Sequence, residues 1–244
     1  MTVLAFGAHP DDVDLYAGGL VALLARQGAK VVLCDLTRGE LGTRGTPELR
    51  AVEAAEAARI LGAAERECLG LPDGGIVRTD RVQERAVVEA MRRWRPELVL
   101  APWEVDLHPD HREAAHLIRR ARFFARVSRF AAAGAPCLPG PILFYEQKIP
   151  FDPHLVVDIG GVREIKLEAI RAFSSQFFRA PDDPIRTEIS EPEFHEMLDA
   201  RSRVHGARIG VGWGEGYRRD EPQAVRDAVE LLPVAALLKQ VERS

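Results

Sequence analysis

The stretch Val3-Leu4-Ala5-Phe6-Gly7-Ala8-His9-Pro10-Asp11-Asp12 opens the chain and indicates its fold. Residues 3–8 form a short apolar run, which is typical of a buried strand, and four polar or turn-forming residues follow it at once. Leucines at helical spacing begin soon afterwards, at Leu15. A buried strand that passes directly into a helix is typical of the first βα unit in an open α/β sheet.

The rest of the chain repeats this alternation of apolar runs and amphipathic segments. Further strands are expected at residues 30–36, 67–69, 97–101, 142–146 and 155–159. Helices are expected at residues 15–27, 48–61, 80–94, 110–126, 162–173 and 191–204. The pattern predicts a single Rossmann-like α/β domain over residues 1–244, with a mainly parallel twisted sheet flanked by helices. We assign no structure after Gly206.

The composition limits the classes of function. A net charge of −4, with both signs interspersed, gives nucleic-acid binding no electrostatic support. No apolar run approaches the roughly 20 residues that span a bilayer, so we expect no membrane partner and a cytoplasmic location. The three cysteines contain no C-x-x-C pair, which favours buried thiols in a reducing cytosol over disulfides: Cys34, Cys68 and Cys137.

A second polar segment, His108-Pro109-Asp110-His111, follows the strand expected at residues 97–101. Open α/β sheets bind ligands beyond the carboxyl ends of their strands, at the point where strand order reverses. In the common order 3-2-1-4, strands one and four flank this point. The segments His9–Asp12 and His108–His111 are therefore expected to meet in one crevice.

The residue types in these segments are those of metal ligands. Histidine and carboxylate side chains suit a divalent metal such as Zn²⁺, and Fe²⁺ accepts the same ligands. Two histidines and one carboxylate leave a coordination position for water, which ionises near neutral pH and becomes a nucleophile. The first turn lacks the G-x-G-x-x-G pattern, so a dinucleotide fingerprint is absent.

The spacing of the polar residues indicates different roles. His9 and Asp12 are three residues apart across a strand-to-helix turn, so both can face one ion. Asp11 points elsewhere and is the expected general base. His108 and His111 share one face if their turn is helical, and one can bind metal while the other faces the substrate carbonyl. The structural alternative is an isolated H-P-D that caps a helix through its aspartate. Two such clusters at neighbouring strands are harder to explain in that way.

Together, Ala8–Asp12 and His108–His111 resemble the PIG-L/LmbE-like glycosyl N-deacetylases. This family includes the glycosylphosphatidylinositol-precursor deacetylase and the mycothiol and bacillithiol deacetylases. Other segments are similar to the bacillithiol-type branch, namely residues 37–45, 71–75, 174–177 and 210–215. The resemblance runs to about residue 217, and the tail from Arg218 carries no recognised motif.

The resemblance implies a role for each polar residue of the two motifs. His9, Asp12 and His111 are expected to bind zinc, in agreement with the spacing. Asp11 is the expected general base and His108 the group that stabilises the oxyanion. Protonated His108 is expected to aid this step, and either Asp11 or His108 is expected to protonate the leaving amine.

Outside the two motifs, the resemblance implies that Arg50 holds the substrate. A guanidinium suits a carboxylate as a bidentate donor, and the alternative is a solvated helix residue. Asp110 is expected to orient a histidine, or to cap the helix. Glu40 and Arg44 lie in a loop expected to overhang the crevice and are further candidates for substrate contact.

The expected activity is metal-dependent hydrolysis of the N-acetyl group on an amino-sugar conjugate. The bacillithiol-like segments favour N-acetylglucosaminyl-malate, whose carboxylates would pair with Arg50. A related amidase acting on another N-acetyl sugar, a chitooligosaccharide or a thiol conjugate is the first alternative. A non-catalytic sugar- or nucleotide-binding protein is the second. The resemblance also implies a homo-oligomer, such as a hexamer.

Overall fold

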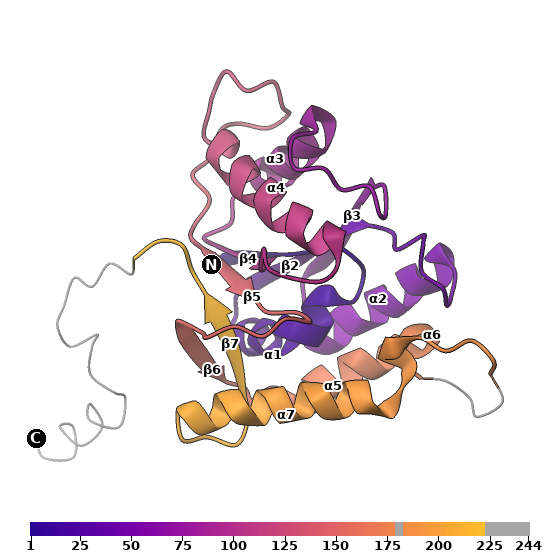
Figure 1. Ribbon diagram of the computed structural model, residues 1–244. Helices are drawn as coiled ribbons and strands as arrows, with labels where there is room; N and C mark the ends of the chain where they lie inside the picture. The colour runs from indigo at the N-terminus through magenta and orange to yellow at the C-terminus, as the bar shows by residue number, and fades with distance from the viewer. Residues whose placement is uncertain (179–182, 223–244) are drawn as a thin grey trace, which may run out of the picture.

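The computed structural model describes residues 1–178 and 183–222. Its strands form one mixed sheet in the order β3-β2-β1-β4-β5-β7-β6 (Figure 1). The strands are β1 (Thr2–Gly7), β2 (Lys30–Thr37), β3 (Glu65–Leu71), β4 (Leu98–Pro102), β5 (Ile142–Tyr145), β6 (Leu155–Asp158) and β7 (Gly214–Arg218). Strands β1 to β5 are parallel, and β1 lies between β2 and β4. The predicted 3-2-1-4 order is confirmed.

Helices cover both faces of the sheet. They are α1 (Asp12–Arg26), α2 (Pro47–Leu61), α3 (Arg81–Trp94), α4 (Pro109–Ala125), α5 (Arg163–Ala172), α6 (Ser174–Phe177) and α7 (Pro192–Arg208). Two 3₁₀ turns, η1 (Gly160–Val162) and η2 (Glu188–Ser190), complete the described elements. Helices α3 and α4 lie on one side of the sheet, and α1, α2, α5 and α7 lie on the other (Figure 1). Each predicted helix is present, with ends that differ by a few residues.

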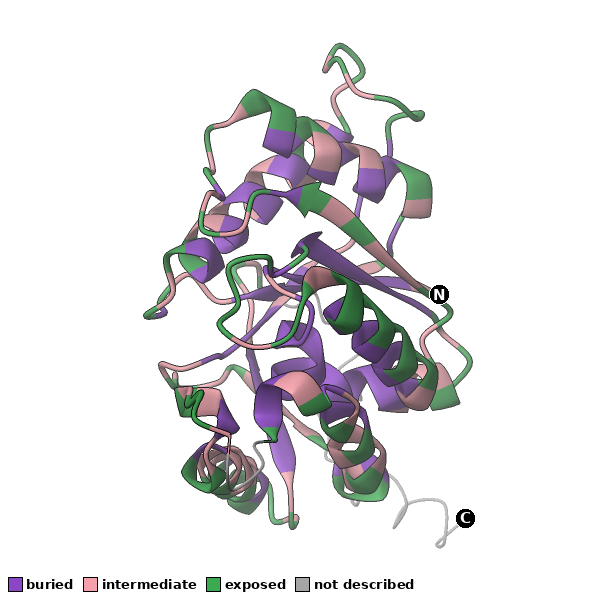
Figure 2. Cartoon of the chain, turned by 90° about the vertical axis from the view of Figure 1, so that its right-hand side faces the viewer, coloured by how far each residue is buried: buried purple, intermediate pink, exposed green. Residues whose placement is uncertain are grey.

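Side chains that alternate along the central strands divide the core into two layers. Val3 and Ala5 of β1 pack among residues of α1, α2 and α5. Leu4 and Phe6 pack among residues of α3 and α4. Figure 2 shows the central strands buried and the helices exposed along their outer faces. Because both faces of these strands are covered, their sequences are continuously apolar.

The segment after Gly206, to which sequence analysis gave no structure, forms β7. This strand is antiparallel to its neighbours β5 and β6. The buried Glu215 accepts hydrogen bonds from the backbone N–H groups of Gly19 and Leu20, both at 2.8 Å. It also pairs with Lys166 of α5 at 2.7 Å. These contacts fasten β7 to α1 and α5.

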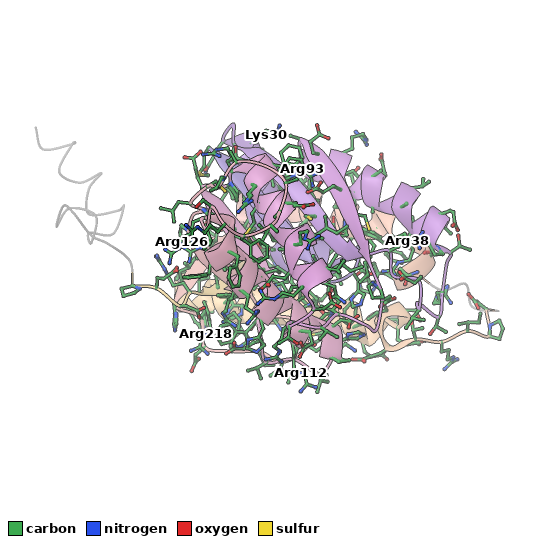
Figure 3. The ribbon with its side chains drawn as sticks, turned by 90° about the horizontal axis from the view of Figure 1, so that it is seen from above. Lys30, Arg38, Arg93, Arg112, Arg126 and Arg218 are labelled. Atoms are coloured by element: carbon green, nitrogen blue, oxygen red, sulfur yellow. The ribbon has the colours of Figure 1, made fainter. Side chains whose placement is uncertain are left out.

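Basic residues and cysteines occupy several different parts of the fold. The six basic residues labelled in Figure 3 come from different elements and are spread around the molecule: Lys30, Arg38, Arg93, Arg112, Arg126 and Arg218. Cys34 and Cys137 are buried free thiols, as expected, whereas Cys68 is a free thiol at an exposed position, so the expected burial is wrong there. Across residues 1–178 and 183–222, no helix combines the length and the apolar character that crossing a membrane requires. Residues 223–244, most of the tail that carried no motif, lie outside the described residues.

Candidate active site

The first motif forms a tight turn between β1 and α1. The carbonyl of His9 accepts hydrogen bonds from the backbone N–H groups of Asp11, at 2.9 Å, and Asp12, at 3.3 Å. The Asp12 carboxylate in turn accepts the backbone N–H of His9 at 2.9 Å. A side chain at Gly7 would place its Cβ only 2.9 Å from the His9 carbonyl oxygen, so the turn requires glycine there. This closed turn holds the His9 and Asp12 side chains on the same side.

The second motif lies between β4 and α4. Pro109 is the first residue of α4, and His108 precedes it as the N-cap. Nδ1 of His108 accepts the backbone N–H of Asp110 at 3.2 Å. His108 and His111 therefore do not share a helical face, because His108 lies outside the helix, but their ring centroids are only 4.8 Å apart.

The two motifs meet, as the strand order predicted. The ring centroid of His9 lies 4.7 Å from that of His108 and 5.3 Å from that of His111. One nitrogen from each of these three rings lies within 4.8 Å of the others, so the cluster could hold a metal ion. The Asp12 carboxylate lies 3.6 Å from Nδ1 of His9 and 3.3 Å from Nε2 of His111. Donor atoms around a tetrahedral zinc ion are about 3.4 Å apart, so the Asp12 carboxylate lies at a suitable distance from each of these two histidine nitrogens.

Carboxylates hold the opposite nitrogens of the two rings. Nε2 of His9 lies 3.0 Å from Asp73 and 3.4 Å from Asp110. Nδ1 of His111 lies 2.8 Å from Asp106. A carboxylate on the far nitrogen fixes the ring orientation of a metal ligand and raises its basicity. His9, Asp73 and Asp110 form a second possible donor group, but both carboxylates face Nε2 of His9, whereas Asp12 faces Nδ1.

Asp110 therefore approaches a histidine, as expected, and it does not cap α4. Its carboxylate also accepts the backbone N–H groups of Gly74, at 2.7 Å, and Ile76, at 3.3 Å. These bonds attach the turn after β3, which carries Asp73, to the start of α4. Asp110 thus fixes the position of the Asp73 carboxylate as well as its own.

Sequence analysis missed three residues that support the ligands. Asp73 lay within a motif that was noted only as a resemblance, and Asp106 precedes the second motif by two residues. Gln147 follows β5 and donates a hydrogen bond from Nε2 to Asp12 at 2.9 Å. The backbone N–H of Lys148 binds Asp106 at 2.8 Å. A polar residue after the strand next to β4 was the available signal for Gln147, since that strand borders the crevice.

The electrostatic surroundings of the two ligand histidines favour positive charge. Burial lowers the pKa of His9, but hydrogen bonds to Asp110, Asp12 and Asp73 outweigh burial and raise it well above its usual value. Burial likewise lowers the pKa of His111, whereas the charge of Asp12 and the hydrogen bond to Asp106 raise it to about 9. A metal cation bound among these carboxylates would supply the positive charge that they favour.

Asp11 lies apart from the ligand set and pairs with Arg50. The Arg50 guanidinium donates from Nη2 to Asp11 at 3.0 Å and from Nη1 to the Gly39 carbonyl at 2.9 Å. Burial raises the pKa of Asp11 above its usual range, although the charge of Arg50 opposes this shift. Arg50 is only 5% exposed, so the alternative of a solvated helix residue is wrong. Its guanidinium faces the expected base.

His108 differs from the ligand histidines in its electrostatics. Burial and the nearby rings of His111 and His9 lower the pKa of His108 below its usual value. This environment disfavours the protonated imidazole that we expected from the sequence. Because Nδ1 accepts the N–H of Asp110, the neutral ring carries its proton on Nε2.

The two loop candidates, Glu40 and Arg44, are engaged within the chain. Glu40 accepts the backbone N–H of Asp73 at 3.0 Å and so braces a carboxylate behind His9. Arg44 donates to the carbonyl of Ser175 at 2.9 Å and to the carboxylate of Asp183 at 2.7 Å. These hydrogen bonds attach the loop to α6 and to Asp183.

A cavity of about 300 Å³ opens above the two motifs. His9, Asp11, Asp12, His108 and His111 all line it. Its remaining wall includes Leu41, Thr43, Arg44, Arg50, Lys148, Gln176, Thr187 and Ile189. The cavity therefore combines the possible metal donors, the Asp11 carboxylate and room for a small polar molecule.

The chain is similar to known deacetylases and to a hydratase. A diacetylchitobiose deacetylase from Thermococcus kodakarensis is 32% identical over 88% of this chain and 82% of its own length. A probable N-acetyl-α-D-glucosaminyl L-malate deacetylase 2 from Bacillus cereus is 28% identical over 71% of this chain and 83% of its own. A 4-oxalmesaconate hydratase from Pseudomonas putida is 30% identical over 72% of this chain and 74% of its own.

A solved structure and a family profile agree with these relatives. The structure of a conserved protein from Thermus thermophilus superposes with a TM-score of 0.84 and 35% identity, over 93% of this chain and 97% of that one. The profile described as PIG-L, GlcNAc-PI de-N-acetylase, matches residues 4–122, which include both motifs. The chain belongs to the PIG-L family of de-N-acetylases.

Proposed function

We propose that this protein is a metal-dependent hydrolase that removes the N-acetyl group from an amino-sugar conjugate. Its family and its deacetylase relatives support an enzyme with N-deacetylase activity on N-acetyl sugar conjugates. One observation carries the proposal. His9 and His111, each with a carboxylate at its other ring nitrogen, face Asp12. The separate, buried Asp11 carboxylate lines the same cavity.

His9, Asp12 and His111 are the residues that would hold the metal. Zn²⁺ and Fe²⁺ both suit a set of two histidines and one carboxylate. When bound, such an ion supplies a Lewis acid for the amide carbonyl and lowers the pKa of water. Asp73, Asp106 and Gln147 orient the three ligands.

Asp11 and His108 divide the proton chemistry between them. A buried carboxylate with a raised pKa suits Asp11 as the base that removes a proton from the attacking water. Neutral His108 donates a hydrogen bond from Nε2 to the developing oxyanion, which requires no positive charge on the ring. The lowered pKa of His108 leaves Asp11, protonated in the first step, as the acid that delivers a proton to the leaving amine.

The substrate proposed first is N-acetylglucosaminyl-malate, as the bacillithiol-like segments indicated. The relative from Bacillus cereus supports it. Diacetylchitobiose is the second candidate. It is included because the deacetylase from Thermococcus kodakarensis is more similar to this chain than the relative from Bacillus cereus is. The two substrates share the N-acetylglucosamine group that would meet the metal, and they differ in charge.

Acetate release and metal content, measured on the same purified sample, test the function. The acetate assay contains both N-acetyl sugars, and a separate hydration assay uses 4-oxalmesaconate, since one relative is a hydratase. Asp11→Asn is expected to retain metal but to lose turnover by about 10²- to 10⁴-fold. Asp152→Asn is the matched control, because Asp152 is 90% exposed and pairs only with Arg208 among the described residues. Full turnover in the Asp11 variant would contradict the general-base role.

A further inference from the structure

Three strongly basic side chains line the described cavity, and they differ in how firmly the chain already holds them. They are Arg44, Arg50 and Lys148. Arg50 is buried against Asp11, so its charge is committed to the expected base. Removing a partner from such a buried pair is costly. Arg50 is therefore a poor candidate for a substrate carboxylate, in contrast to the role first expected from the sequence.

Arg44 is committed in the same way. Its guanidinium donates to the carbonyls of Ser175, Phe178 and Ile185, as well as to Asp183. These bonds hold the segment around α6 in place. A substrate that drew Arg44 away would lose several hydrogen bonds within the protein.

Lys148 is different, because its partner is exposed. Its ammonium group forms an ion pair with the carboxylate of Glu188, at the start of η2. The side chain of Lys148 is 26% exposed and that of Glu188 is 69% exposed. Exposed ion pairs contribute little to stability, so another carboxylate can replace Glu188 at small cost.

The backbone of Lys148 is fixed while its side chain remains exchangeable. Its N–H donates to Asp106 at 2.8 Å, and its carbonyl accepts a hydrogen bond from Arg201 of α7 at 3.1 Å. The preceding residue, Gln147, holds Asp12. The ammonium group is thus carried on the same short segment that orients an expected metal ligand.

We propose that the Lys148–Glu188 ion pair selects substrates by charge, and that a carboxylate on an N-acetyl amino sugar replaces Glu188 on Lys148. This inference rests on the proposed deacetylase function. Of the three strongly basic side chains that line the cavity, Lys148 is the one whose partner is exposed, so a substrate carboxylate can reach it at small cost. Glu188 competes for Lys148 and keeps its charge balanced when a neutral sugar is bound.

Variants at the two positions are expected to act in opposite directions. Lys148→Met should raise KM for N-acetylglucosaminyl-malate by about three- to tenfold and change KM for diacetylchitobiose by less than about twofold. Glu188→Gln should lower KM for the malate conjugate, because Lys148 loses its competing partner. Lys148→Arg keeps the charge and should restore most of the selectivity. The quantity that decides is the ratio of the KM values for the two sugars in each variant.

Two matched controls and a binding assay complete the experiment. Lys30→Met and Glu65→Gln make the same charge changes at the amino ends of β2 and β3. The site lies beyond the carboxyl ends of the parallel strands. Calorimetric binding of glucosaminyl-malate, the deacetylated product, should weaken in Lys148→Met and strengthen in Glu188→Gln.

The outcomes separate this inference from the proposed function. Equal KM changes for both sugars, or the same changes in the control variants, would overturn the role of the ion pair. If no acetate is released from any N-acetyl sugar, the deacetylase proposal fails. The calorimetric comparison then still decides whether Lys148 binds a carboxylate.

Discussion

Arg50 donates a hydrogen bond to Asp11 across 3.0 Å, and both side chains are buried beside the cavity. This pair joins the start of α2 to the turn before α1. It commits the arginine to the expected base and leaves substrate charge to be met elsewhere.

The first prediction concerns this pair. Arg50→Gln should lower kcat by about 10- to 100-fold, with similar factors for a neutral and a carboxylated substrate, because Asp11 loses its charged partner. Kinetics on N-acetylglucosaminyl-malate and diacetylchitobiose measure the two factors. A rise in KM confined to the malate conjugate would instead restore the carboxylate clamp first expected for Arg50.

A second prediction concerns the carboxylate behind His111. Asp106→Asn should weaken metal binding by about 10- to 100-fold, because Nδ1 of His111 loses its charged partner. Competition with a chelator measures the affinity. Asp152→Asn, at an exposed carboxylate that pairs with Arg208, should leave it unchanged. Equal affinities for the two variants would show that Asp106 does not support the metal ligand.

The third prediction concerns Gln147, whose Nε2 donates to Asp12 at 2.9 Å. Gln147→Leu should weaken metal binding by about three- to tenfold, because the Asp12 carboxylate loses a hydrogen bond and can then rotate. Metal titration of the purified variant gives the change. Gln147→Asn, whose amide is one carbon too short to reach Asp12, should recover little of the affinity. Unchanged affinity in Gln147→Leu would indicate a role in packing rather than in hydrogen bonding.

The fourth prediction is a pH dependence of stability that originates away from the ligands. Burial raises the pKa of Asp35 to about 6, although Arg66 opposes the shift. Between the unfolded value, near 4, and 6, the folded state holds a proton that the unfolded state has released. The contribution of Asp35 to the free energy of unfolding therefore falls as pH rises through this range.

Urea denaturation at pH 4.5, 5.5 and 6.5 tests this sign. The wild-type protein should lose stability relative to Asp35→Asn as the pH increases, because the variant has no proton to release. A difference that stays constant, or that moves in the other direction, would show that the Asp35 pKa is not raised.

The sequence predicted the positions of the central strands because both faces of those strands are buried. Continuous apolar runs and helical spacing then identify each element by its period. The meeting of His9 with His111 followed from topology, since β1 and β4 are neighbours in the 3-2-1-4 order. Both inferences needed only local patterns and one rule on strand order.

Other features depended on contacts that local patterns do not contain. Arg50 lies on a helix of nearly uniform polarity, so only the position of Asp11 explains its burial. Asp106 and Gln147 are single polar residues after strands, and their roles arise from the distance to His111 and Asp12. Strand β7 contains two glycines and two charged residues, and its Glu215 is buried because α1 supplies two N–H donors.

The place of β7 in the sheet also orders the events of synthesis. Among the described strands, β6 hydrogen-bonds to β7 alone, although β6 leaves the ribosome first. Strand β5, which leads into Gln147 and Lys148, has β7 as its outer neighbour. A nascent chain therefore contains both histidine motifs long before it can close the sheet beside them. We therefore expect the strands that border the candidate site to complete their pairing only after the last described strand has emerged.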